Sequence, residues 1–238
     1  MENIVIHKAD TRGLTKLDWL EARQTFSFGS YFNPERIRFG ALRVLNDDVI
    51  AGEKGFGDHP HDNMEIITIP LEGALTHRDN LGNEAVIRAG EIQVMSAGTG
   101  AYHSEFNHDP SQPVRSLQIW LYPNKRNVEP RYDQQKVDIE ERNVLHQILS
   151  PDPQDKGVWI YQHAWFHIGK FDKGHEAIYQ LKDGGNGVYV FVISGDVTVN
   201  GQALNSRDGM GLWNTSHLNI KADTDTEVLL MEVPMNID

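Results

Sequence analysis

Two pairs of metal-binding residue types occur at the same spacing in this sequence. GFGDHPHDNMEI contains His59 and His61, and AYHSEFN contains His103 and Glu105. Side chains two positions apart on a β-strand point to the same face. Each pair could therefore clamp a ligand from one strand, and three imidazoles with one carboxylate suit a divalent transition metal that keeps positions free for further ligands.

The spacing alone leaves two interpretations of these four residues open. On exposed edge strands they would be ordinary polar surface side chains. In a barrel interior, a charged Glu105 beside three histidines would be costly without a cation, because burying an unpaired charge is unfavourable. An interior position therefore predicts a bound metal.

Length and composition limit the classes of protein. A chain of 238 residues with 39% hydrophobic residues can form one large all-β unit or two small domains. Its formal net charge of -12 opposes direct nucleic-acid binding. With no cysteine, any metal must bind to His and carboxylate groups. The N-terminus lacks a basic-then-apolar signal and no apolar stretch approaches about 18 residues, so we expect a cytoplasmic protein without membrane association.

The hydrophobic pattern is that of β-strands. Segments such as SLQIWLY, VYVFVIS and EVLLMEV are short, rich in β-branched or aromatic residues, and bounded by Gly, Asn and Asp. This pattern predicts an all-β sandwich or barrel, and barrel closure removes exposed strand edges. We expect only a few short helices, in LDWLEARQ (17–24), PERI (34–37) and VDIEERN (137–143).

An internal repeat indicates two similar halves. The segments LEGALTHRDNLGNEAVIRAGEI and ISGDVTVNGQALNSRDGMG match in order at Gly73 and Gly195, Thr76 and Thr198, Gly82 and Gly201, Arg88 and Arg207, and Gly90 and Gly209. Duplication of a hairpin-rich unit explains these matches. It predicts two barrels, residues 1–130 and 131–238, joined within 122–135, where Pro, charged and amide residues interrupt the strand pattern.

The repeat predicts that only the first barrel binds metal. It aligns the first histidine pair with residues 181–183 and the second pair with residues 222–224, and neither segment retains a ligand pair. The remaining histidines of the second half have no paired spacing, and we interpret them as surface or packing residues. Four of the five histidines of this half are meant: His163, His167, His175 and His217.

The motifs resemble those of a known family. GFGDHPHDNMEIITIPLEG and AGEIQVMSAGTGAYHSEFN look like the two cupin motifs, and nearly the whole chain resembles a pirin, the two-domain branch of the cupin superfamily. The resemblance implies a bicupin of two tandem jelly-roll-like barrels, with His59, His61, His103 and Glu105 as metal ligands. Many cupins use a glutamate of the first motif, and Glu65 stands there at the strand parity of His61. Glu65 would then be a hydrogen-bond partner or a substitute ligand.

The resemblance also implies an activity. Some pirins are quercetin 2,3-dioxygenases, which open a flavonol with O2 and release carbon monoxide. We expect one divalent transition metal, iron(II) first, with copper, nickel, manganese, cobalt or zinc as alternatives. Glu105 is the expected catalytic base for the flavonol 3-hydroxyl. Candidate walls of an apolar slot, although ordinary barrel core is the favoured interpretation of any single one, are Phe26, Phe28, Phe32, Phe39, Phe56, Met95 and Trp120.

The same resemblance implies a competing class. Pirins also include metal-binding regulators that dock onto transcription or metabolic proteins, and such a role requires a protein partner. A regulator needs an exposed interaction patch, whereas an enzyme needs an open coordination site that substrate can reach. A metal-free structural bicupin is a third interpretation, and the intact set of three histidines and one glutamate argues against it.

Overall fold

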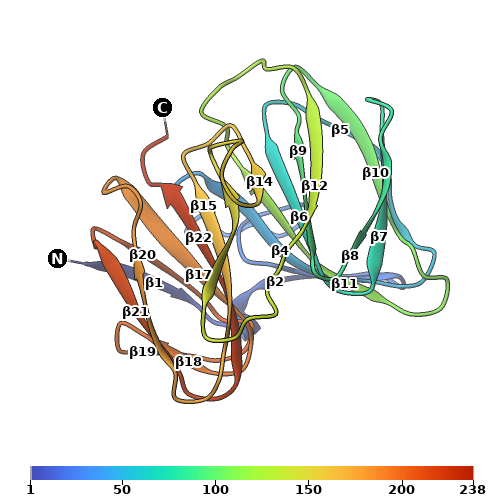
Figure 1. The fold of residues 1–238 in the computed structure, drawn as a ribbon. Helices are drawn as coiled ribbons and strands as arrows, with labels where there is room; N and C mark the ends of the chain where they lie inside the picture. Colours follow the sequence, from blue (N-terminus) through green and yellow to red (C-terminus); the bar gives the residue numbers. More distant parts are fainter. Residues whose placement is uncertain (1, 238) are drawn as a thin grey trace.

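Two β-barrels lie side by side in the computed structural model, which describes residues 2–237 (Figure 1). Each barrel combines a seven-stranded and a four-stranded sheet. Within the described residues the sole helical element is a 3-10 turn, Ala9–Thr11. The prediction of an all-β chain with two barrels is therefore confirmed. Among residues 2–237, no helix is long and apolar enough to span a membrane.

The N-terminal barrel is formed mainly by the first half of the chain. Its larger sheet has the order β12 (Arg131–Lys136), β9 (Glu91–Ser96), β6 (Glu65–Glu72), β11 (Val114–Leu121), β4 (Leu42–Ile50), β3 (Leu20–Gln24) and β2 (Gly13–Lys16). Its smaller sheet has the order β5 (Gly55–His61), β10 (Ala101–Asn107), β7 (Ala74–Asp79) and β8 (Glu84–Arg88).

The C-terminal barrel repeats this arrangement. Its larger sheet has the order β1 (Asn3–His7), β20 (Gly209–Trp213), β17 (Asn186–Ser194), β22 (Thr226–Pro234), β15 (Trp165–Phe171), β13 (Leu145–Ser150) and β14 (Val158–Trp159). Its smaller sheet has the order β16 (Glu176–Gln180), β21 (His217–Ala222), β18 (Val197–Val199) and β19 (Gln202–Leu204). The two orders agree position by position, as a duplication requires.

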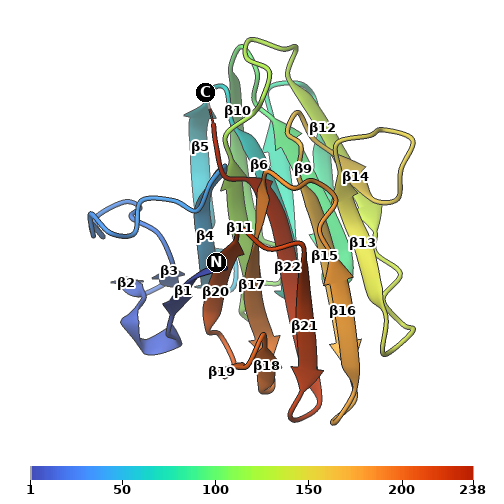
Figure 2. The same ribbon diagram turned by 90° about the vertical axis from the view of Figure 1, so that its left-hand side faces the viewer.

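The two halves exchange one strand each. Strand β1, at the N-terminal end of the chain, pairs with β20 of the C-terminal barrel, with Ile4 opposite Leu212 (Figure 2). Strand β12 pairs with β9 of the N-terminal barrel, with Asp133 opposite Val94. Residues 131–135, expected to belong to the joint, thus lie within a paired strand. The division into residues 1–130 and 131–238 stays a prediction, but each large sheet is completed by a strand from the other half.

The segments expected to be helical adopt other structures. Residues 20–24 form β3, whose residues Leu20, Ala22 and Gln24 are buried in alternation. Segment 34–37 contains a turn, and segment 137–143 has no regular structure. In β3, pairing with β4 supplies every second side chain with a buried position, so tertiary context overrides the helical propensity of LDWLEARQ.

The two barrels share a hydrophobic core. Strand β17 is buried on both faces, which explains its unbroken hydrophobic run. Val188 and Val190 pack inside the C-terminal barrel, whereas Tyr189 and Phe191 pack between the barrels. His7 of the exchanged strand β1 joins this core, because its Nδ1 lies 2.8 Å from the Tyr189 hydroxyl. Packing between the barrels thus fixes their relative position.

The interiors of the two barrels differ in polarity. Five polar residues lie opposite one another on adjacent strands of the N-terminal barrel, and we call them the polar row: Gln24, Asn46, Gln118, Thr68 and Gln93. On the matching strands of the C-terminal barrel the same row reads Gln147, His167, Leu230, Val190 and Met210. The positions of Gln118, Thr68 and Gln93 are therefore polar in the N-terminal barrel and apolar in the C-terminal one.

The strand exchange predicts that fragments 1–130 and 131–238 cannot fold separately. The first would lack β12 and the second would lack β1, so each would expose the edge of its large sheet. Each fragment alone should aggregate or remain unfolded by circular dichroism, whereas co-expression should give a folded 1:1 complex that elutes with the intact chain. Two monomeric fragments that each unfold cooperatively would contradict this prediction.

Candidate metal centre

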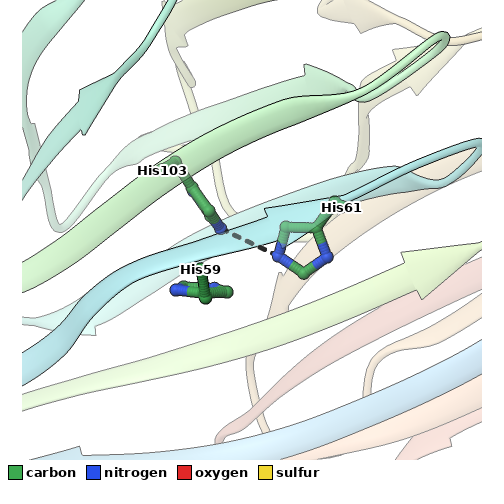
Figure 3. Close-up of side chains that lie close together, drawn as sticks. All are labelled: His59, His61 and His103. Carbon is green, nitrogen blue, oxygen red and sulfur yellow. Dashed lines mark hydrogen bonds between the residues drawn. The ribbon is translucent and has the colours of Figure 1, made fainter.

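Strands β5 and β10 bring the three predicted histidines together. His59 lies directly opposite His103, and His61 lies opposite Ala101. The ring centroids of His59 and His103 are 4.4 Å apart, and each is 4.9 Å from the ring of His61. Figure 3 shows the three side chains converging from the two strands, with His61 Nε2 and His103 Nε2 3.0 Å apart.

A backbone contact determines which nitrogen of His59 is available. His59 Nδ1 lies 2.8 Å from the Gly57 carbonyl oxygen. Because a carbonyl only accepts hydrogen bonds, Nδ1 carries the proton, and Nε2 keeps its lone pair. Nε2 of His59 is therefore the nitrogen free to bind a metal.

A second histidine outside the predicted set supports His103. His77 is fully buried, and its Nε2 donates to Asp79 Oδ2 at 3.0 Å. A neutral His77 then presents Nδ1 as an acceptor to His103 Nδ1, 3.5 Å away. This chain of contacts places the His103 proton on Nδ1 and leaves Nε2 bare toward the cluster. Tyr132, on the exchanged strand β12, lies against His77 with ring centroids 4.7 Å apart.

The sequence contained a signal for this pair that was missed. His77 and Asp79 have the same spacing as His103 and Glu105, and both pairs lie on strands of the four-stranded sheet. A search for every histidine two positions before an acid would have found them. The sequence does not show, however, that β7 pairs with β10, which places His77 opposite Glu105 and Asp79 opposite His103.

Burial keeps two of the imidazoles uncharged. Burial, together with the smaller effect of the neighbouring histidines, lowers the pKa of His61 to about 4 and that of His103 to about 3. Both rings are therefore neutral at pH 7. Neutral imidazole is the form that binds a metal ion, so folding prepares these rings as ligands.

Glu105 shares the interior face of β10 with His103, as predicted. A bulge in β5 places Phe56, rather than Gly57, opposite Glu105. The carboxylate is buried and accepts hydrogen bonds from Thr68 Oγ1 at 2.9 Å and Gln118 Nε2 at 2.6 Å. Two residues of the polar row, Thr68 and Gln118, thus orient Glu105.

The cluster has two overlapping parts. In one, ligand atoms of His59, His61 and His103 lie within 4.8 Å of one another. In the other, His103 is grouped in the same way with Glu105 and His77. Glu105 therefore lies on the His103 side of the three imidazoles.

Glu65 lies outside this cluster. It accepts a hydrogen bond from Ser96 Oγ at 2.7 Å and has the opposite strand parity to Thr68, which faces Glu105. Burial raises its pKa to about 7, although hydrogen bonds from Ser96 and from the backbone of Tyr161 act in the opposite direction. The expected shared parity with His61 was wrong, because residues 62–64 between β5 and β6 are not in a strand.

A cavity of about 240 Å³ adjoins the cluster. His59 and Glu105 form part of its lining, and three of the seven candidate wall residues, Phe28, Phe56 and Trp120, complete an apolar side. The Phe28 and Trp120 rings meet edge to face, with centroids 5.1 Å apart. The cavity can therefore hold a planar apolar group beside the histidines.

The other four candidates lie elsewhere. Phe26 and Phe39 pack in the core between the barrels. Met95 is fully buried in a small cluster with Ile66. Phe32 is 74% exposed. Aromatic type alone did not distinguish cavity walls from core because both require apolar surface.

The C-terminal barrel has apolar residues at the matching positions. Aligned on the turn glycines Gly73 and Gly195, His77 matches Val199, whose partner on β21 is Ile220 where β10 has Glu105. Two positions earlier on β21, Leu218 lies opposite Tyr179 where His103 lies opposite His59. The alignment with residues 222–224 was thus four positions too late. The matching residues belong to the hydrophobic core of that barrel.

The remaining histidines of the second half form no cluster with other ligand types among the described residues. His167 is buried, with its ring centroid 4.9 Å from that of Tyr179. His163 is exposed, and His175 and His217 are partly exposed. Their interpretation as packing or surface residues agrees with these positions.

Comparison with known proteins identifies the family. The family model for pirin matches residues 7–121, and that for the quercetinase C-terminal cupin domain matches residues 147–233. An Escherichia coli protein named quercetin 2,3-dioxygenase is 39% identical over 231 residues, which are 97% of this chain and 99% of that protein. The chain belongs to the pirin family. A pirin-like protein of Caulobacter vibrioides is 38% identical over 216 residues, 90% of this chain and 92% of that protein.

Solved pirin structures share the fold. The crystal structure of the Escherichia coli pirin YhhW in complex with nickel(II) superposes with a TM-score of 0.92 and 38% identity, and the match covers 98% of this chain and 99% of that one. A second structure of YhhW gives a TM-score of 0.94 over 99% of this chain and 100% of that one, at 38% identity. The predicted pirin family and bicupin fold are confirmed.

The contacts around His77 predict the tautomer of His103 in this pirin. In the metal-free protein, nitrogen-15 NMR should show the His103 proton on Nδ1. His77→Phe keeps a buried ring against Tyr132 but removes the acceptor, so the His103 proton should redistribute between its two nitrogens. The exposed His163→Phe is the matched control and should leave the His103 signal unchanged. A wild-type His103 with its proton on Nε2 would contradict the assignment.

Proposed function

We propose that His59, His61 and His103 hold one divalent transition metal, with Glu105 as a fourth ligand. The donor set suits this class of ion: three imidazoles converge from two paired strands, with the Nε2 atoms of His61 and His103 3.0 Å apart, and a carboxylate lies beside His103. Iron(II) is our first choice, and copper, nickel, manganese, cobalt or zinc would fit the same nitrogen and oxygen donors. The nickel(II) complex of YhhW supports binding of a divalent transition metal by this chain.

We propose further that this pirin is a dioxygenase that cleaves quercetin-like flavonols with O2 and releases carbon monoxide. The observation that carries the proposal is the cavity, which brings apolar walls, His59 and Glu105 together. The name of the Escherichia coli relative supports the same substrate class. A regulatory role with a protein partner, a cytoplasmic location and the absence of direct nucleic-acid binding stay predictions.

The residues of the cavity would share the chemistry. A bound metal would supply Lewis acidity and open positions for oxygen ligands. Phe28, Phe56 and Trp120 would hold the planar substrate and exclude water from one side. Glu105 would accept the proton of the 3-hydroxyl, and the hydrogen bonds from Thr68 and Gln118 would aim its oxygens at that proton.

Replacement of Glu105 separates proton transfer from metal binding. Glu105→Gln keeps the size and one coordinating oxygen but cannot accept the proton. Oxygen uptake and quercetin bleaching should fall by about 100-fold or more, as loss of a general base typically does, while elemental analysis should show retained metal.

The matched control is Glu65→Gln, which alters a buried glutamate on the other face of the sheet. It should keep activity close to wild type. Full activity of Glu105→Gln would remove Glu105 as the base. If the metal-loaded wild type consumes no oxygen with any flavonol, the dioxygenase proposal fails.

A further inference from the structure

Three polar side chains of the cavity have oxygen atoms without hydrogen-bond partners among residues 2–237. They are Gln24 Oε1, Asn46 Oδ1 and Asp48 Oδ1, on strands β3 and β4. The side chains are only 2%, 3% and 5% exposed, respectively. Buried acceptors are rarely left unpaired in folded proteins, because the loss of hydration is not compensated. We call these three residues the polar wall.

Sheet register places the polar wall in line with Glu105. Gln24 lies opposite Asn46, and Asn46 lies opposite Gln118, whose Nε2 donates to Glu105 Oε2 at 2.6 Å. Neighbouring strands are about 4.8 Å apart, so Gln24 lies about 10 Å from Gln118 along the polar row. A ligand that contacts Glu105 and also reaches Gln24 must therefore extend beyond a single aromatic ring.

The unpaired atom of Gln24 is its acceptor. Gln24 Nε2 donates to Thr15 Oγ1 at 2.8 Å, which leaves the carbonyl oxygen Oε1 as the unpaired atom. On the apolar side, Trp120 Nε1 is a buried donor that also lacks a partner. A ligand in this cavity thus meets three acceptors along one strand pair and one donor on the aromatic wall.

Asp48 adds to the wall as an uncharged group. Within residues 2–237 no basic side chain pairs with it, whereas its neighbour Asp47 pairs with Arg12 and Arg207. Burial, with Asp47 and Glu105 nearby, raises the pKa of Asp48 to about 8. At pH 7 the side chain is mainly a neutral acid, which can accept one hydrogen bond and donate another.

We propose that the polar wall recognises hydroxyl groups on the rings of the ligand, and so selects polyhydroxylated flavonols over flavonols that carry only the 3-hydroxyl. This inference rests on the proposed function and assigns its specificity. Phenolic O–H groups would donate to Gln24, Asn46 and Asp48. A flavonol without them would bury the same acceptors unpaired, and that loss selects against it.

Anaerobic calorimetry of the metal-loaded protein tests the inference without turnover. Quercetin is compared with 3-hydroxyflavone, which lacks every ring hydroxyl except the one at position 3. The wild type should bind quercetin at least about tenfold more tightly, even though 3-hydroxyflavone is the more apolar ligand. Asn46→Leu keeps the size but removes the acceptor, and should reduce the preference to about threefold or less with no loss of 3-hydroxyflavone affinity.

Two further substitutions separate recognition from folding. Asp48→Leu should also reduce the preference, whereas Asp48→Asn, which keeps an acceptor, should retain most of it. Gln93→Leu is the matched control, because Gln93 belongs to the polar row and is buried with both side-chain polar atoms unpaired, but does not line the cavity. It should leave the preference unchanged. If Asn46→Leu does not fold, the inference is tested by the flavonol preference of the wild type and of Asp48→Leu.

The outcomes distinguish this inference from the proposed function. Equal affinity of the wild type for the two flavonols, binding of neither, or an unchanged preference in the leucine variants overturns the inference. Preferential quercetin binding that depends on the wall, with no oxygen uptake in air, supports the inference and rejects the dioxygenase. Oxygen uptake in air, with both flavonols bound equally well, supports the dioxygenase and rejects the inference.

Discussion

The antiparallel pairing of β5 with β10 is the constraint on which the site depends. It sets His59 directly opposite His103 and places the ring centroid of His61 4.9 Å from the centroid of each of the other two rings. Side chains alternate along a strand, so a slip of one residue would send each pair to the opposite face. The bulge before His59 then shifts the register of β5, so that Phe56 instead of Gly57 lies opposite Glu105. The three histidines therefore form a cluster because of the register between β5 and β10, and not because of residue type alone.

The rest of the N-terminal barrel supports this pairing from two sides. On β7, the contact between Asp79 and His77 orients His103, and Tyr132 of the exchanged strand β12 covers His77. On the large sheet, the polar row orients Glu105 through Thr68 and Gln118. Because β12 comes from the second half of the chain, the site of one barrel requires residues from both halves. The C-terminal barrel contributes packing instead, with a hydrophobic interior and one face of the shared core.

Local spacing explains which parts of the site and fold were predictable. Two residues at positions i and i+2 share a face of any strand, so the pairs His59 with His61 and His103 with Glu105 could be recognised before their strands were placed. Hydrophobic runs such as VYVFVIS likewise identify buried strands wherever they pair. Non-local pairing was not predictable. Strands β1 and β12 exchange between halves, and β3 forms where LDWLEARQ has helical propensity, because distant partners decide both outcomes. Glu65 was misplaced for a related reason: parity does not carry across the turn that follows His61.

Anomalous diffraction at the absorption edge of the bound metal tests the central claim most directly. Crystals of the purified, metal-loaded protein should give one strong anomalous peak per chain, at bonding distance, on the order of 2 Å, from nitrogens of His59, His61 and His103 and from a Glu105 oxygen. The C-terminal barrel should give none. A peak of comparable height in the C-terminal barrel, or a single peak bound by Glu65 instead of Glu105, would contradict the account.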